Sequence, residues 1–508
     1  MKRRKTLICT TLALLLALAA VFASCRSADE PYGDPDANRE IPQGSVQLTI
    51  GPEPGEHALI AFSAELDPHF FSYNVGRSGV NGQGENWECK AEDWDTYVVP
   101  RVRDMNLQRI RVMFLPSWVA EEESSYTNRE YTFESKGMQS LYKVLDLADE
   151  LDIDVNLTYW GADSPCEWLT DKSLAGWCVN PAEGMEQQFC DIFTDTVKYL
   201  MDEKGYGCIR EITIFNEPTG IFKPFGNVKG NGMYCDICRL MHETFEKAGI
   251  RDRVKFALSD DTSDSVWLAQ TCAQLSDIMD IASSHSYYWG NEHTNEQMQN
   301  SSPYAFKNFH TVMADYPEIP HFFGELGMNT GIDTHTVTNA ATAERGLTIS
   351  RIVVNMINSG SAGASYWVLF NQYYDDVDSR IMNMGLWAFA DEGYVCRPVY
   401  YAYSLFTRFG QNGSDIFTIQ SPDPNIAAFA LRSPEGKWSY FVVNDSERDI
   451  SVSFLNEAKF PSALNKYVYD ENNVPTDNKV IPSSGRMTPD GRVLTDTISG
   501  RSFAVYAE

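Results

Sequence analysis

The sequence predicts an α/β fold in which a (β/α)8 TIM barrel is followed by a small C-terminal antiparallel β-sandwich. Between residues 46 and 410, eight apolar strand-like runs alternate with stretches of helical periodicity, which is the element count of such a barrel. From residue 411 to residue 508 the apolar runs are shorter and are separated by clusters of Pro, Gly, Asn and Asp, a pattern typical of sandwiches. The length of 508 residues and a hydrophobic content of 43% provide for a sizeable core.

The eight barrel-strand candidates are short and apolar, as expected of parallel strands that are buried on both faces. They are Ala58–Ala64, Arg109–Leu115, Asp154–Trp160, Glu211–Asn216, Val254–Ser259, Asp280–His285, His321–Glu325 and Ala364–Phe370. Apolar residues recur at helical spacing between several of them, for example from Met138 to Leu151 and from Phe189 to Leu200. A doubly wound open sheet is the structural alternative, but the chain lacks the glycine-rich nucleotide-binding motifs that such sheets carry.

The sandwich candidates alternate apolar and polar residues. They are Ile419–Ser421, Ala427–Leu431, Trp438–Val443, Ile450–Phe454, Lys466–Asp470 and Ser502–Tyr506. Val46–Ile50, which precedes the barrel, is a candidate extra strand of this sandwich.

The N-terminus predicts export. Four basic residues precede an apolar run that ends at Ala23-Ser24-Cys25, which is the pattern of a secretory signal over residues 1–25. Cys25 resembles a lipobox cysteine, so we expect lipidation there, a flexible tether over residues 26–45, and a cell-envelope or extracellular location. The net charge of −29 repels phosphate backbones and makes nucleic acid a poor candidate partner.

Signals for metal or cofactor chemistry are weak. Nine cysteines follow Cys25 without the spacing of a dense disulfide framework, and Cys235-x-x-Cys238 is interpreted as two semi-buried helix cysteines. Ser259–Asp264 carries three aspartates but no spaced calcium-binding pattern, so we expect a solvated loop. There is no H-E-x-x-H zinc motif and no G-x-S-x-G nucleophile elbow. We therefore expect neither a metal nor a cofactor.

Two glutamates follow apolar strand-like runs. Glu217 lies in Ile212–Pro218, where Pro218 stops the strand, and Glu325 ends the run that begins at His321. By count these are the fourth and seventh barrel strands, whose carboxyl ends open into one mouth. Two carboxyl groups facing each other are what cleavage of a glycosidic bond requires, one as proton donor and one as nucleophile or base.

The Asn-Glu-Pro motif at the fourth strand, with a glutamate at the seventh, resembles glycoside hydrolase clan A over roughly residues 58–405. The resemblance implies a retaining enzyme with Glu217 as acid/base, Glu325 as nucleophile and Asn216 as a ligand of the sugar 2-hydroxyl. It also implies substrate-binding roles for His285, Tyr287, Trp367 and Arg111, with Arg109 as an alternative to Arg111. Trp160 follows a predicted strand and is a candidate to line a sugar subsite.

Placement within the clan stays open. The arginine, Asn-Glu-Pro and His-x-Tyr set resembles family 5, whereas a terminal sandwich joined by an N-terminal strand resembles families 30 and 39. The resemblance implies a carbohydrate substrate, with an endo-acting β-glucanase or β-mannanase as the first expectation. An exo-acting, β-xylosidase-like enzyme and a catalytically inactive glycan-binding lipoprotein are the alternatives. The oligomeric state is left open.

Overall fold

The computed structural model describes residues 41–81, 83–173, 178–222, 229–288, 306–328, 340–373 and 381–508. The chain divides into two compact units, Met1–Gln43 and Gly44–Glu508, and the barrel and the sandwich both belong to the second. The predicted signal segment, Cys25 and most of the predicted tether lie outside the described residues. In the part of the chain that the structure describes, no helix is both long enough and apolar enough to span a membrane.

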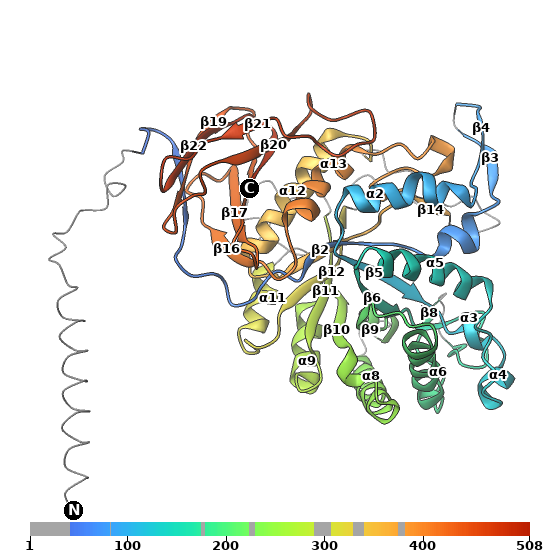
Figure 1. Cartoon of the computed structure of the whole chain (residues 1–508). Helices are drawn as coiled ribbons and strands as arrows, with labels where there is room; N and C mark the ends of the chain where they lie inside the picture. The colour runs from blue at the N-terminus through green and yellow to red at the C-terminus, as the bar shows by residue number, and fades with distance from the viewer. Residues whose placement is uncertain are drawn as a thin grey trace, which may run out of the picture. The chain divides into compact units, whose positions relative to one another are not determined.

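Eight parallel strands close into a barrel, which confirms the predicted fold class (Figure 1). In chain order they are β2 (Ala61–Glu65), β5 (Arg109–Phe114), β6 (Asp154–Tyr159), β9 (Ile209–Ile214), β10 (Lys255–Thr262), β11 (Ile281–Tyr288), β12 (His321–Met328) and β13 (Gly363–Tyr366). Each corresponds to one predicted run. The main differences lie at the carboxyl ends, where β10, β11 and β12 continue by three residues beyond the predicted ends.

Helices surround the barrel and follow the predicted periodicity. In α5, one face buries Met138, Leu141, Leu145 and Ala148, and the Ser135 side chain caps the first turn by accepting a hydrogen bond from the Met138 amide. The helices are α2 (Val99–Asp104), α3 (Ser117–Ala120), α4 (Glu123–Thr127), α5 (Lys136–Glu150), α6 (Glu186–Lys198), α7 (Pro218–Phe222), α8 (Lys229–Ala248), α9 (Ser265–Leu275), α11 (Phe306–Met313), α12 (Ala343–Asn358) and α13 (Pro398–Phe409).

Short two-stranded sheets lie in the loops of the described part of the chain. They are β3 (Ser78–Val80) with β4 (Asn86–Glu88), β7 (Ala162–Asp163) with β8 (Cys178–Val179), and β14 (Gln372–Tyr373) with β15 (Ile381–Met382).

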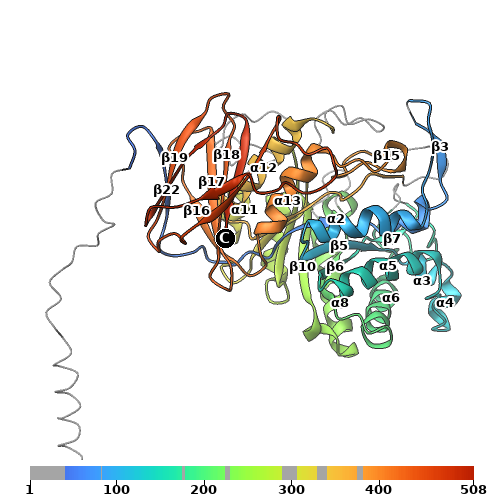
Figure 2. The same cartoon turned by 45° about the horizontal axis from the view of Figure 1, so that its top comes forward.

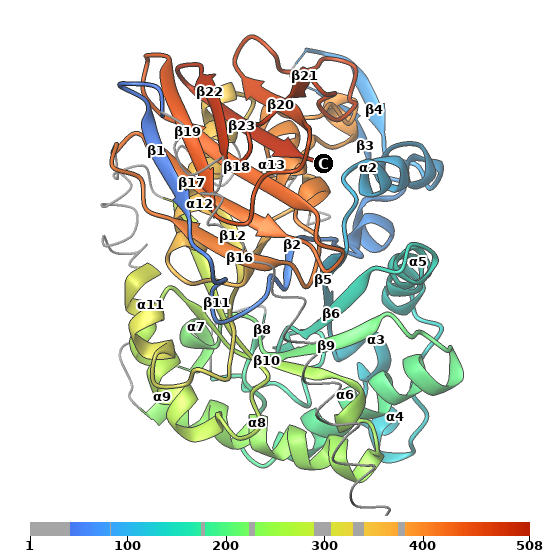
Figure 3. The ribbon, with the colours of Figure 1, turned by 60° about the vertical axis from the view of Figure 1, so that its left-hand side comes forward.

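The C-terminal sandwich consists of a six-stranded sheet, in the order β16-β17-β18-β23-β20-β21, and a three-stranded sheet, in the order β1-β19-β22. The strands are β1 (Val46–Ile50), β16 (Asp415–Ile419), β17 (Ile426–Arg432), β18 (Trp438–Asn444), β19 (Ile450–Asn456), β20 (Leu464–Asp470), β21 (Gly485–Met487), β22 (Val493–Ile498) and β23 (Ser502–Ala507). The N-terminal strand β1 pairs in parallel with β19 (Figure 3). The first sandwich strand lies earlier than predicted, and β21 and β22 were not predicted.

The sandwich packs against the barrel through two helices. Figure 2 shows α12 and α13 between the barrel and the six-stranded sheet. Phe406 of α13 stacks on Phe503 at 4.7 Å and on Phe441 at 5.6 Å between ring centroids. Because these rings belong to the same buried cluster as the barrel residues, the barrel core continues to one side of the six-stranded sheet, while the residues between the two sheets of the sandwich form a separate buried cluster.

The nine cysteines from Cys89 to Cys396 are all free thiols. Cys235 and Cys238 lie on α8 and are both buried, so the helical interpretation is confirmed although burial is more complete than predicted. Burial raises the pKa of Cys235 to about 12, which keeps its thiol protonated and unreactive.

Candidate active site

Glu217 follows the fourth barrel strand in a strained turn. β9 ends at Ile214, and both Phe215 (φ 69°) and Glu217 (φ 46°) adopt left-handed backbone conformations that non-glycine residues rarely take. Phe215 is fully buried and stacks on Phe189 at 4.8 Å, which anchors the turn. The strain is thus held by packing, and it leaves the Glu217 side chain 37% exposed at the mouth of the barrel.

Glu325 lies within the seventh barrel strand, β12, and its side chain is only 5% exposed. The Glu325 carboxylate nevertheless lies close to that of Glu217. One carboxylate oxygen of each, together with a ring nitrogen of His285, lie within 4.8 Å of one another. Because one oxygen of each lies this close, the two carboxyl groups are near neighbours, as in retaining glycosidases, whose carboxyl groups are roughly 5–5.5 Å apart.

Arg111 connects the second strand to both glutamate-bearing segments. Its Nη1 donates to Glu325 Oε1 at 2.6 Å, and its Nη2 donates to Asn216 Oδ1 at 2.8 Å. Burial acts to lower the pKa of Arg111, but neighbouring carboxylates raise it above its ordinary value. Arg109, the alternative, pairs instead with Glu211 at 2.6 Å. Arg111, and not Arg109, is therefore the arginine that contacts Glu325.

His285 and Tyr287 project from β11 toward the carboxyl pair. His285 Nδ1 lies 3.0 Å from Glu217 Oε1 and 3.3 Å from Glu325 Oε2. The Tyr287 hydroxyl donates a short hydrogen bond to Glu325 Oε2. Burial raises the pKa of Tyr287 well above its usual range, so this hydroxyl remains a donor at neutral pH.

Trp160 and Trp367 form an aromatic wall beside these groups. Their ring centroids are 5.9 Å apart, and Trp367 is 6% exposed. Trp160 also lies over the Arg111 guanidinium at 4.9 Å, a favourable cation–π geometry. Tyr287 and Met384 complete the same apolar cluster. All eight of the predicted catalytic and substrate-binding residues are thus brought together at one place.

Two buried carboxyl groups at this site were not predicted. Glu65, the last residue of the first barrel strand, lies 3.3 Å from Arg111 Nη1, and Asp260 on the fifth strand lies 2.9 Å from Arg111 Nη2. Both follow apolar runs, which is the signal that identified Glu217 and Glu325. The expected solvated loop at Ser259–Asp264 is wrong, because Asp260 and Asp261 are fully buried in β10.

The charges of the site are partly compensated. Arg111 and His285 face four carboxyl groups, those of Glu65, Glu217, Asp260 and Glu325. Burial raises the pKa of Glu325 above its ordinary value, while His285 and Arg111 oppose that rise. Burial also raises the pKa of Glu65 well above its usual range, although the charge of Arg111 opposes that rise.

Glu217, His285 and Glu325 could in principle each offer one ligand atom to a metal ion. Both oxygens of Glu325 already accept hydrogen bonds, Oε1 from Arg111 and Oε2 from Tyr287. A cation placed between the three side chains would also be repelled by the Arg111 guanidinium. The donor set therefore fits a hydrogen-bonded carboxyl pair better than a metal centre.

The raised pKa of Glu65 should affect how the free energy of unfolding depends on pH. A carboxyl whose pKa is raised on folding binds more protons in the native than in the unfolded state, so its contribution to stability is lost as pH rises above the unfolded value of 4.5. We expect Glu65→Gln to make the fall in unfolding free energy between pH 5 and pH 8 shallower, by up to about 1.4 kcal/mol per pH unit.

Urea unfolding at several pH values measures this slope. Glu88→Gln is the matched control, because Glu88 is exposed and its replacement should leave the slope unchanged. A Glu65→Gln protein with the wild-type slope would contradict a protonated Glu65.

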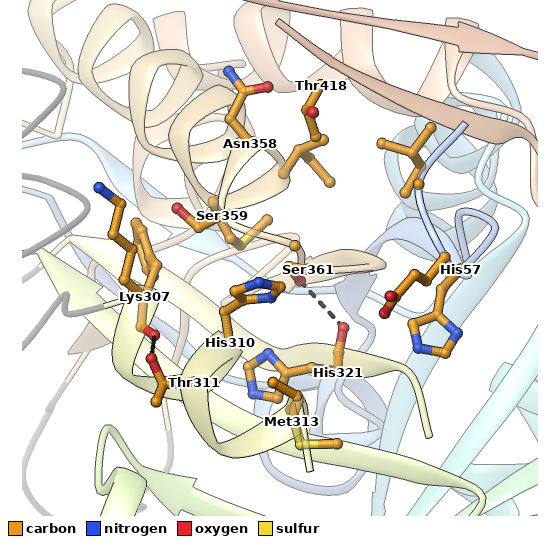
Figure 4. Close-up of a pocket in the computed structure, with 18 of the residues that line it drawn as sticks. His57, Lys307, His310, Thr311, Met313, His321, Asn358, Ser359, Ser361 and Thr418 are labelled. Carbon is orange, nitrogen blue, oxygen red and sulfur yellow. Dashed lines mark hydrogen bonds between the residues drawn. The ribbon is translucent and has the colours of Figure 1, made fainter. Parts of the chain in front are cut away.

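A cavity of about 590 Å³ lies outside the candidate active site (Figure 4). It is lined by His321 at the start of β12, by His310 of α11, by Ser359 after α12 and by Thr418 of β16. It is therefore at the amino-terminal end of the barrel, whereas the carboxyl pair lies at the carboxyl-terminal end, where such barrels place their chemistry. Its lining contains none of the candidate active-site residues.

Comparison with known proteins places the fold. No protein-family model and no curated protein sequence matches the chain. Among solved structures, it is similar to a family 30 endoxylanase from Clostridium papyrosolvens C71, with 12% identity, a TM-score of 0.63, and coverage of 91% of this chain and 99% of the other. It is also similar to an endo-β-1,6-glucanase, with 14% identity, a TM-score of 0.62, and coverage of 92% and 95%.

A family 39 enzyme from Xanthomonas axonopodis pv. citri is a third such structure, with 12% identity, a TM-score of 0.61, and coverage of 92% and 99%. The chain therefore has the fold of solved clan A glycoside hydrolases, including members of families 30 and 39. At such low identity this similarity establishes the fold alone.

Proposed function

We propose that this protein is a retaining β-glycoside hydrolase. The observation that carries the proposal is the carboxyl pair of Glu217 and Glu325, with oxygens within 4.8 Å of one another at the carboxyl ends of the fourth and seventh barrel strands. Such a close approach favours the retaining arrangement over the inverting one, in which the carboxyl groups are roughly 6.5–9.5 Å apart to hold a water.

In the first step, Glu325 attacks the anomeric carbon while protonated Glu217 gives its proton to the leaving oxygen. The glycosidic C–O bond breaks and a covalent glycosyl-enzyme ester forms. Arg111 and Tyr287 hydrogen-bond to Glu325 and orient its carboxylate. Asn216 is held by Arg111 through its Oδ1 atom, which leaves its amide nitrogen to donate to a substrate hydroxyl.

In the second step, Glu217 removes a proton from water, which attacks the same carbon and releases the sugar and the Glu325 carboxylate. Formation of the ester removes the negative charge of Glu325 from beside Glu217. Glu217, which gave up its proton in the first step, is the carboxylate that accepts a proton from water in the second.

For the substrate, we propose a β-linked polysaccharide or oligosaccharide, with endo-acting β-glucanase or β-mannanase activity first and exo-acting β-xylosidase-like activity second. The names of two structural relatives, an endoxylanase and an endo-β-1,6-glucanase, favour endo action. The Trp160–Trp367 wall offers the aromatic faces on which the C–H face of a pyranose stacks. Export and lipidation at Cys25 are part of the proposal and rest on the N-terminal sequence.

A product profile on a panel of β-glucans, β-mannans and β-xylans tests the substrate class. Internal cleavage gives a ladder of oligosaccharides, and terminal cleavage gives one monosaccharide from the start. Proton NMR of the first product reports the anomer, for which we expect retention. Tight oligosaccharide binding without any product over several days would support the inactive glycan-binding alternative.

A further inference from the structure

Asp260 lies between the two cations of the site. Its Oδ2 accepts a hydrogen bond from Arg111 Nη2 at 2.9 Å and lies 3.1 Å from His285 Nε2. Its Oδ1 accepts a hydrogen bond from Ser283 Oγ at 2.6 Å. The side chain is only 1% exposed. One carboxylate therefore joins the arginine that binds Glu325 to the histidine that faces Glu217.

The backbone is shaped to place this carboxylate. Ser259 (φ 83°) and Asp260 (φ 46°) are left-handed, and the pairing of β10 with β11 shifts register between Ser259 and Asp261. Such a bulge redirects a side chain next to an active site. Gly324, which precedes Glu325, makes the room, since a Cβ there would lie 2.8 Å from Asp260 Oδ1 and 2.5 Å from Ser283 Oγ.

We propose that Asp260 is a positioning residue that holds Arg111 and the Nε2 side of His285, so that His285 Nδ1 is directed between Glu217 and Glu325. This inference rests on the proposed function and adds a residue that acts through other residues and does not touch the sugar.

The electrostatics agree with this geometry. Burial acts to raise the pKa of Asp260, but His285 and Arg111 lower it well below its usual range, so the carboxylate remains ionised. Burial acts to lower the pKa of His285, but Glu325 and Asp260 raise it well above its usual range. The other groups that face His285 are Glu217, by hydrogen bonding, and Asp261, by charge.

Asp260→Asn keeps the shape of the side chain and removes its charge. Loss of an anion within hydrogen-bond distance should lower the pKa of His285 by about one unit or more. The pH profile of kcat should also move to lower pH, because the same anion raises the pKa of every neighbouring acid. We expect kcat at the wild-type optimum to fall about a hundredfold, the cost of a misplaced catalytic constellation.

Asp261→Asn is the matched control. Asp261 is the next residue on the same strand and is equally buried, but it accepts hydrogen bonds from Ser259 Oγ, Ser284 Oγ and the Asp264 amide, and its hydrogen bonds do not involve Arg111 or His285. Burial raises the pKa of Asp261 to about 7. Below neutral pH its carboxyl group is therefore largely uncharged, as the asparagine side chain of the variant is. Because Asp261 acts on His285 by charge alone, we expect a much smaller fall in the His285 pKa than in Asp260→Asn, and the wild-type pH profile below neutral pH.

Nitrogen-15 NMR of the imidazoles supplies a readout that needs no substrate. The His285 signals are identified by their absence from His285→Gln. In the wild-type protein, Nε2 should carry a proton throughout the range in which the enzyme is active, because the ionised Asp260 carboxylate lies 3.1 Å from it. This measurement remains decisive if Asp260→Asn does not fold.

The inference is overturned if His285 is a neutral tautomer that lacks the Nε2 proton, or if Asp260→Asn leaves both the His285 pKa and the pH profile as in the wild type. If the wild-type protein cleaves no glycoside but the His285 pKa still falls in Asp260→Asn, the proposed function fails and the positioning role stands. If Glu325→Gln is inactive while Asp260→Asn is wild-type in all respects, the proposed function stands and the positioning role fails.

Discussion

Replacement of Glu325 by glycine should reduce turnover of aryl β-glycosides by about 10⁴-fold or more, because the atom that attacks the anomeric carbon is removed. Added azide should then restore part of the turnover by entering the space left by the carboxylate. Because azide attacks from the nucleophile's side, the product should be the α-glycosyl azide. Steady-state kinetics with and without azide and NMR of the product measure both effects.

The rescue serves as an internal control for folding, since a misfolded protein would not respond to azide. Glu325→Gln should be equally inactive but without rescue, because its side chain still fills the space. Wild-type turnover in either variant would contradict the assignment of Glu325 as nucleophile.

Replacement of Glu217 by alanine should affect substrates unequally. Substrates with poor leaving groups need a proton from Glu217, and their turnover should fall by about 10²–10⁴-fold. A substrate with a dinitrophenol leaving group needs no such proton, so its first step should remain fast and the glycosyl-enzyme should accumulate. A burst of dinitrophenol followed by slow turnover is the expected result in rapid-mixing kinetics.

Azide distinguishes the two glutamates. In Glu217→Ala it should attack the accumulated ester from the face opposite Glu325 and give the β-glycosyl azide, the anomer opposite to that formed by the Glu325 variant. An equal loss on all substrates, without a burst, would indicate that Glu217 does not act as the acid/base.

The barrel and both reacting carboxyls could be predicted because their signals are local. Each strand is a short apolar run, and Glu217 and Glu325 each follow such a run at a position that the order of elements assigns to one mouth. Pro218 adds a sharp strand end to the first of them. These features need no knowledge of which segments pair.

Asp260 and Glu65 also follow apolar runs, but their contacts with Arg111 could not be predicted because they are created by the closed barrel. Ser259–Asp264 is polar in sequence and resembles a solvated loop, yet β10 continues to Thr262 and buries Asp260 against Arg111 of another strand. Likewise, β21 and β22 carry little apolar periodicity, and they are strands because β20 and β19 lie beside them. Burial of a charged group by distant partners is a tertiary property.

The parallel pairing of β1 with β19 gives the compact unit an unusual order of assembly. Both of its chain ends, β1 and β23, are strands of the sandwich, and the whole barrel is inserted between them. During synthesis β1 leaves the ribosome long before β19. The first strand therefore cannot pair until the entire barrel has been synthesised. The sandwich therefore cannot be transplanted or removed as a C-terminal accessory, because it loses a strand when either β1 or β23 is cut away.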